Sequence, residues 1–199
     1  YMAFIAPGLI MMAIITNSYS NTVSSFFSTK FQRNIEELLV SPTPSWVIVL
    51  GYISGGMSRG LSVGILVAAV SQVFVRLPLH SVTFTLLFAV LTSFVFSLAG
   101  MINGIFAKKF DDISIIPTFV ITPLTYLGGV FYSISLLPPF WQGVSKANPI
   151  IYMISGFRYG FLGITDINVW AGAAMLVMFA LLLFGANLFL LQRGTGIRT

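Results

Sequence analysis

The feature that most constrains this chain is a succession of apolar runs of about 20 residues, repeated along the sequence. A helical run of that length crosses the hydrocarbon core of a bilayer. The runs are apolar on nearly all faces, whereas a transmembrane barrel needs short strands with a polar lumen side. With 57% hydrophobic and 8% charged residues, the chain is predicted to be an all-α polytopic membrane protein.

Five transmembrane helices are predicted, at about residues 1–27, 45–75, 82–106, 113–131 and 169–192. Pro117, Pro123 and the pair Gly128-Gly129 predict that the fourth helix is kinked or broken. The chain begins at Tyr1, without methionine and inside an apolar pattern. We therefore expect it to be a fragment that lacks an upstream part.

One charged stretch, KFQRNIEELLVSPTP from Lys30 to Pro44, interrupts the apolar sequence. At 100° per residue its apolar members share a narrow arc, opposite the charged ones. The apolar members are Phe31, Ile35, Leu38 and Leu39, and the charged ones are Arg33, Glu36 and Glu37. Pro42 and Pro44 end this pattern. Residues 30–41 are predicted to form a short amphipathic helix beside the membrane, with its charged face toward water or another protein.

Small residues form two ladders along the second predicted span. Gly56, Gly60 and Gly64 recur at four-residue spacing, and a second face carries Gly51, Ser54, Gly55, Ser58 and Ser62. Such faces let neighbouring backbones approach closely, so this helix is predicted to be sandwiched in the bundle. Arg59 lies on the same helix, and we expect its side chain to reach the near interface because the uninterrupted apolar run starts only at Gly60. The alternative is a functional charge inside the membrane.

The first predicted span carries a polar face along its second half. It consists of Asn17, Asn21, Ser24, Ser25 and Ser28. The spacing favours hydrogen bonds between helices, and the alternative is a polar wall of a transport path.

Residues 132–162 are too apolar for a solvated loop and too interrupted for a span. Pro138-Pro139 can start one short helix, and Asn148-Pro149 can cap and start a second. Two short apolar helices in succession predict a re-entrant or interfacial hairpin. Its polar and aromatic residues Trp141, Tyr152, Arg158 and Tyr159 suit the headgroup level. Asp166 is predicted to cap the last span.

Basic residues indicate the orientation. Lys30, Arg33, Lys108, Lys109, Arg193 and Arg198 fall on one side, and Arg76, Lys146 and Arg158 on the other. The positive-inside rule places the amphipathic helix in the cytoplasm and the hairpin outside. The net charge of +5 is thereby explained without a nucleic-acid partner.

The sequence predicts no catalytic, cofactor-binding or metal site. No carboxylate lies inside a predicted span, which disfavours a proton-relay transporter. The chain lacks cysteine, has a single histidine, and contains no GxxxxGK[ST] phosphate loop. Energy for any transport must therefore come from a partner, and the charged amphipathic helix offers the docking surface.

The sequence resembles the permeases of type-2 ABC exporters, the ABC-2 family, over all 199 residues. Its most specific part is an ordered set of residues, Pro117, Pro123, Gly128, Gly129, Phe131, Leu137, Pro138, Asn148, Pro149 and Arg158. FQRNIEELLVSP also resembles the family's segment after its second span. The resemblance implies a single ABC-2 transmembrane domain over residues 1–199 that lacks its N-terminal part, with six spans in the full subunit.

The resemblance further implies a homodimer in the bacterial inner membrane, with cytoplasmic ABC ATPase subunits that carry ATP and Mg. Residues 30–41 would be the coupling helix, and residues 132–162 the extracellular re-entrant helices that close the outer gate. The expected function is a permease subunit, without its own ATPase site, that exports an amphipathic or lipid-linked substrate. A non-transporting membrane assembly or scaffold protein is the alternative, followed by a secondary transporter.

Overall fold

The computed structural model describes residues 2–165, 167–194 and 196, and the backbone alone at residue 39. The expectations for Tyr1, Asp166, Arg198 and the Leu39 side chain lie outside this description. The described chain is helical throughout, with short connections. Four helices are long and apolar enough to cross a membrane: α1 (Met2–Phe31), α3 (Ser45–Phe74), α4 (Val82–Phe106) and α9 (Val169–Arg193). All four agree with the predicted spans to within a few residues.

The fourth predicted span is broken, as its prolines and glycines predict, but it ends earlier than expected. It is built from α5 (Asp112–Ile116), a π-helical turn η1 (Pro117–Ile121) and α6 (Thr122–Leu127). Pro117 has no N–H, and the Thr122 hydroxyl donates to its carbonyl over 2.9 Å. The helix stops before Gly128, and Gly129 has a φ of 81°, so the predicted end at residue 131 is wrong. At 1.5 Å per residue the composite helix is about 24 Å long, shorter than a hydrocarbon core of about 30 Å.

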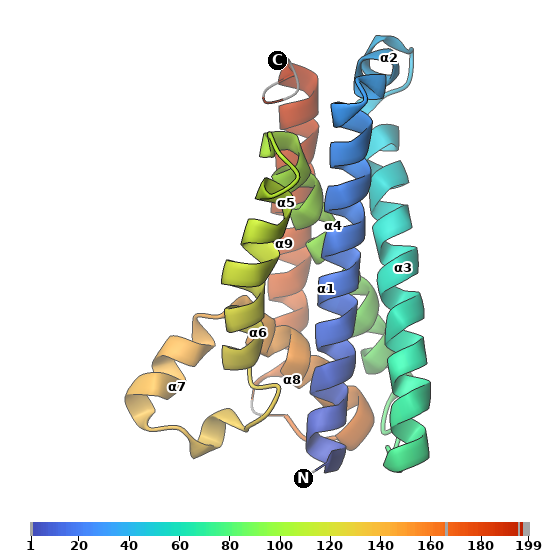
Figure 1. Cartoon of the computed structure of the whole chain (residues 1–199). Helices are drawn as coiled ribbons and strands as arrows, with labels where there is room; N and C mark the ends of the chain where they lie inside the picture. The colour runs from blue at the N-terminus through green and yellow to red at the C-terminus, as the bar shows by residue number, and fades with distance from the viewer. Residues whose placement is uncertain (1, 166, 195, 197–199) are drawn as a thin grey trace.

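Helix α1 is the centre of the bundle and packs most extensively on α3 and α4 (Figure 1). Small residues permit both contacts. A Cβ at Gly60 would lie 3.0 Å from the Ile14 carbonyl oxygen, and one at Gly100 would lie 2.6 Å from the Tyr19 carbonyl oxygen. The Ser18 and Ser93 hydroxyls hydrogen-bond at 2.7 Å between α1 and α4.

The two small-residue faces of α3 have different environments. Gly56, Gly60 and Gly64 lie against α1, where added Cβ atoms would overlap side chains or backbone. The second face is exposed in the described chain, and a Cβ at Gly51 would meet nothing within 4 Å. Within the described chain only the first face is packed, and packing of the second face stays a prediction.

The predicted polar face of α1 also differs from its first interpretation. Asn17 donates to the Ala13 carbonyl at 2.9 Å and Ser24 to the Ser20 carbonyl at 2.6 Å, both within α1. The bond between helices is instead made by Ser18, which lies on the buried side. Sequence periodicity identifies a face but not the element that faces it.

The segment after α6 forms a 3₁₀ turn η2 (Ile134–Leu136), then α7 (Pro139–Lys146) and α8 (Pro149–Leu162). Asn148 caps α8 as predicted, because its Oδ1 accepts the Ile150 N–H at 3.0 Å. Figure 1 shows α7 projecting from the bundle, whereas α8 packs among α1, α4 and α9. Helix α9 is capped by Asn168. Arg158 is not the exposed interfacial anchor that the sequence suggests, since only 2% of its surface is exposed.

Candidate functional site

Helix α2 (Asn34–Val40) lies beyond the end of the bundle at which α9 ends, opposite α7 (Figure 1). We call this the α2 end. The predicted helix over residues 30–41 is in fact divided, because α1 continues to Phe31 and Arg33 adopts a left-handed φ of 63°. Phe31 therefore ends α1 and is 62% exposed. Ser41 ends α2, with its N–H donated to the Glu37 carbonyl over 3.0 Å.

One side of α2 is anchored to the bundle and the other is exposed. The Ile35 side chain is 1% exposed and enters an apolar cluster with Phe26, Val49, Leu98 and Met101 from α1, α3 and α4. Leu38 is half-buried beside the same cluster. Glu36 and Glu37 are exposed and, with Val40 and Ser41, line a surface hollow of about 480 Å³. Helix α2 thus presents two carboxylates from a position fixed by Ile35.

Arg33 does not brace these carboxylates as the helical spacing predicts. Its left-handed backbone places it before the first turn of α2, so the i,i+3 and i,i+4 geometry does not apply. Among the described residues, Arg33 forms no ion pair with Glu36 or Glu37.

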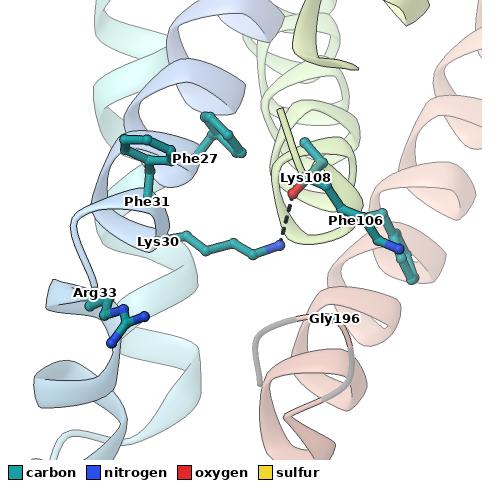
Figure 2. Close-up of a pocket in the computed structure, with 8 residues that line it drawn as sticks. Phe27, Lys30, Phe31, Arg33, Phe106, Lys108 and Gly196 are labelled. Atoms are coloured by element: carbon teal, nitrogen blue, oxygen red, sulfur yellow. Dashed lines mark hydrogen bonds between the residues drawn. The ribbon is translucent and has the colours of Figure 1, made fainter. Parts of the chain in front are cut away.

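A second hollow of about 590 Å³ lies next to the helix break at Arg33, between the end of α1 and the turn after α4 (Figure 2). Lys30, Arg33 and Lys108 line it together with aromatic side chains. Lys30 extends across to α4, where its Nζ donates to the Ile105 carbonyl at 2.6 Å and the Ala107 carbonyl at 2.9 Å. A cation at these carbonyls offsets the negative end of the α4 dipole. The last turn of α1 is thereby fastened to the end of α4.

The turn between α4 and α5 is closed by Asp112. Its Oδ2 accepts the backbone N–H groups of Lys108 at 2.8 Å and Lys109 at 3.0 Å. These two hydrogen bonds hold the pKa of the Asp112 carboxyl below its ordinary value. The turn also carries Phe110, whose ring packs edge-on against Phe27 at 4.9 Å and Phe31 at 5.2 Å between centroids. Aromatic packing therefore links this turn to the end of α1.

The ordered set from residues 117 to 158 is brought partly together at the opposite end. Arg158 on α8 donates from Nη2 to the Gly129 carbonyl at 2.6 Å and from Nε to the Phe4 carbonyl at 3.3 Å. Its guanidinium lies 3.7 Å from the centre of the Phe4 ring. Asn148 donates to the Leu124 carbonyl at 2.7 Å, and Gly128 lies against Ile150. We call the contacts of Arg158 with Gly129 and Phe4 the Arg158 clasp.

Other members of the set lie apart from the Arg158 clasp. Pro117 and Pro123 belong to the broken helix, Phe131 stacks on Tyr126 with 5.6 Å between centroids, and Leu137-Pro138 precede α7. Sequence reasoning missed the roles of Phe4 and Lys30. Both act through contacts with residues far away in the chain, for which local periodicity carries no signal.

The described residues contain no group of three histidine or acidic side chains placed to hold a metal ion. The described chain is thus a bundle of apolar helices with the charged helix α2 at one end and the buried Arg158 clasp at the other.

Comparisons with known proteins agree with this arrangement. Residues 1–162 match the family described as ABC-2 type transporter. The chain is 62% identical over 199 residues to the inner membrane transport permease YadH of Escherichia coli (strain K12), an alignment covering 100% of this chain and 78% of the relative. It is 29% identical over 196 residues to nodulation protein J of Sinorhizobium fredii, covering 97% of this chain and 74% of that protein. The predicted resemblance is confirmed.

Proposed function

Because this chain belongs to the ABC-2 type transporter family and is a multi-pass transport permease of the inner membrane, we propose that it is the membrane subunit of an exporter driven by a separate ATPase. The partner is a cytoplasmic ABC ATPase of the YadG type, which carries the ATP and Mg, and a second copy of the permease completes the path. The substrate is amphipathic or lipid-linked.

The observation that carries this proposal is the division of α2 into an anchored side and an exposed acidic side. A docking element that transmits movement needs contact with its partner and a rigid connection to the rest of the protein. Glu36 and Glu37 supply exposed charge for basic residues of the ATPase. Ile35 supplies the connection, because its cluster includes residues from α1, α3 and α4. Residues 30–41 are thus proposed to couple ATP hydrolysis to movement of the bundle.

At the opposite end of the bundle, α8 is the element that we propose is moved when the ATPase acts on α2. Helix α8 contacts α1, α4 and α9, and the Arg158 clasp joins it to the Gly129 turn and the first turns of α1. We propose that residues 132–162 close the outer gate. A tilt of α1 driven from the α2 end changes the position of the Phe4 carbonyl relative to Arg158, and so provides contacts that differ between two states.

The experiment is charge reversal on α2. Glu36→Arg combined with Glu37→Arg should abolish copurification of the ATPase, or leave the complex assembled without transport-linked ATP hydrolysis. Asp111→Arg is the control, because it reverses an exposed carboxylate at the same end but outside α2. Normal copurification and normal transport by the double variant would contradict the coupling role. Elution of each permease as a single species in size-exclusion chromatography establishes that it is folded.

A further inference from the structure

Arg59 is an exposed cation half-way along α3. It is the fifteenth residue of a 30-residue helix, so it lies about 21 Å from Ser45 in a helix about 45 Å long. The adjacent Gly60 contacts Ser18 near the middle of α1, which places Arg59 far from either end of both helices. An arginine so far from both ends of its helix is costly in hydrocarbon unless polar groups surround it. Its environment should therefore supply polar groups.

The structure provides a hollow of about 380 Å³ beside Arg59. It lies between α1, α3 and the start of the broken helix. In Figure 1, α1 runs between α3 on one side and α5 on the other. The polar side chains that line it are Ser20, Asn21 and Ser24 from α1, Arg59 from α3, and Ser114 and Thr118 from α5 and η1. We call this space the Arg59 hollow.

The described lining of the Arg59 hollow includes hydroxyl and amide groups but no carboxylate. The Arg59 guanidinium and the Asn21 amide form no hydrogen bond or ion pair with other described residues. The carboxylates of Glu36, Glu37, Asp111 and Asp112 belong to α2 and to the turn after α4. The described chain thus places a positive charge, with hydrogen-bond donors beside it, without a negative partner.

We propose that the Arg59 hollow binds the anionic head, a phosphate or a carboxylate, of an amphipathic ligand. A guanidinium donates two parallel hydrogen bonds to either group. The Ser20 and Thr118 hydroxyls and the Asn21 amide can complete the set, whereas the Ser24 and Ser114 hydroxyls already donate to backbone carbonyl groups. Phe119 follows Thr118 in the chain and is 74% exposed, offering an apolar surface for the tail. This inference rests on the proposed export function, because it assigns the substrate class, and it places the polar face of α1 in the path.

The test measures binding to the permease alone in a neutral detergent, by the thermal unfolding midpoint. Dodecyl phosphate should raise the midpoint saturably, whereas dodecyl phosphocholine, with the same tail and no net charge, should not. Inorganic phosphate should bind more weakly than dodecyl phosphate because it has no tail. Arg59→Gln should weaken dodecyl phosphate binding about 10- to 100-fold, as expected for loss of a charged hydrogen-bond donor. Arg59→Lys should retain part of the binding.

The control is Arg76→Gln, which removes an exposed arginine from the connection between α3 and α4 and should leave binding unchanged. Equal binding of the two dodecyl ligands by the wild type would overturn the proposal, as would equal affinity of the wild type and Arg59→Gln for dodecyl phosphate. Because no ATPase takes part, this result is independent of the charge reversal on α2.

A second measurement separates the two sources of such a ligand. If dodecyl phosphate also stimulates ATP hydrolysis by the complex, and Arg59→Gln abolishes the stimulation, the ligand is of the transported class. Arg59-dependent stabilisation without stimulation identifies the ligand as a resident anionic lipid and overturns the substrate assignment.

Discussion

Close packing of α1 on α3 predicts a large effect from one methyl group at Gly60. In Gly60→Ala, the new Cβ would lie 3.0 Å from both the Ile14 carbonyl oxygen and the Ser18 Cβ, and it would overlap the Ser18 hydroxyl. Carbon contacts are favourable at about 3.5–4.0 Å, so the helices must separate by about 0.5–1 Å. The Ser18 hydroxyl must also turn away, which breaks its 2.7 Å bond to Ser93.

The magnitude follows from these three contributions. Overpacking of this kind costs about 1–3 kcal/mol, and loss of a hydrogen bond between membrane helices costs about 0.6 kcal/mol. Replacing glycine by alanine within a helix returns about 0.5–1 kcal/mol. Gly60→Ala should therefore lower the free energy of unfolding by about 1–3 kcal/mol.

Gly51→Ala is the matched control in the same helix. A Cβ there meets nothing within 4 Å, so only the favourable helix propensity remains and stability should be unchanged or slightly higher. Reversible unfolding in mixed detergent micelles, followed by circular dichroism, measures both variants. If the two variants have the same stability, the described packing of α1 on α3 is wrong at this point.

The other predictions concern the two ends of the bundle. Arg158→Gln removes two charged hydrogen bonds, to the Gly129 and Phe4 carbonyls, each worth about 1.5–3 kcal/mol, and a buried cation–π contact of about 2 kcal/mol. It should destabilise the protein by several kcal/mol in the same unfolding measurement, and Arg158→Lys should retain part of that stability. Wild-type stability of Arg158→Gln would contradict the Arg158 clasp. Asp112→Ala removes the carboxylate that accepts the Lys108 and Lys109 N–H groups in the α4–α5 turn. The folded pKa of Asp112 lies below its unfolded value of about 3.9. The stability that this carboxylate contributes is therefore present above that value and is lost as the pH falls through the folded pKa. The difference in melting temperature between wild type and Asp112→Ala should therefore be constant near neutral pH and shrink in acid, and a difference that persists unchanged in acid would refute this account.

Sequence patterns predicted most of the helical architecture, because length and hydropathy determine what can cross a bilayer. Helix α4 runs from Val82 to Phe106, as predicted, and Asn148-Pro149 starts α8. These features depend on local chemistry: continuous apolar sequence, a side-chain cap, and a proline without an N–H.

The predictions that failed concern residues whose environment is set by contacts with segments far away in the sequence. The break at Arg33 has no glycine to mark it, and it occurs where Lys30 bonds to α4 and Ile35 enters a cluster from four other helices. Arg158 looks like an interfacial anchor in sequence, yet two carbonyl groups from distant segments allow its burial. The role of residues 30–41 in coupling and that of residues 132–162 in gating stay predictions.

Helix α1 is held near both ends by cations on backbone carbonyl groups, since Arg158 binds the Phe4 carbonyl and Lys30 binds the end of α4. Between these points it is an unbroken helix about 45 Å long, with Pro7 close to its start. If such a rod tilts rigidly by about 5°, one end moves by about 4 Å relative to the other. That displacement exceeds the length of a hydrogen bond. A rotation small enough to preserve side-chain packing at the α2 end is thus large enough to release a contact at the opposite face of the membrane.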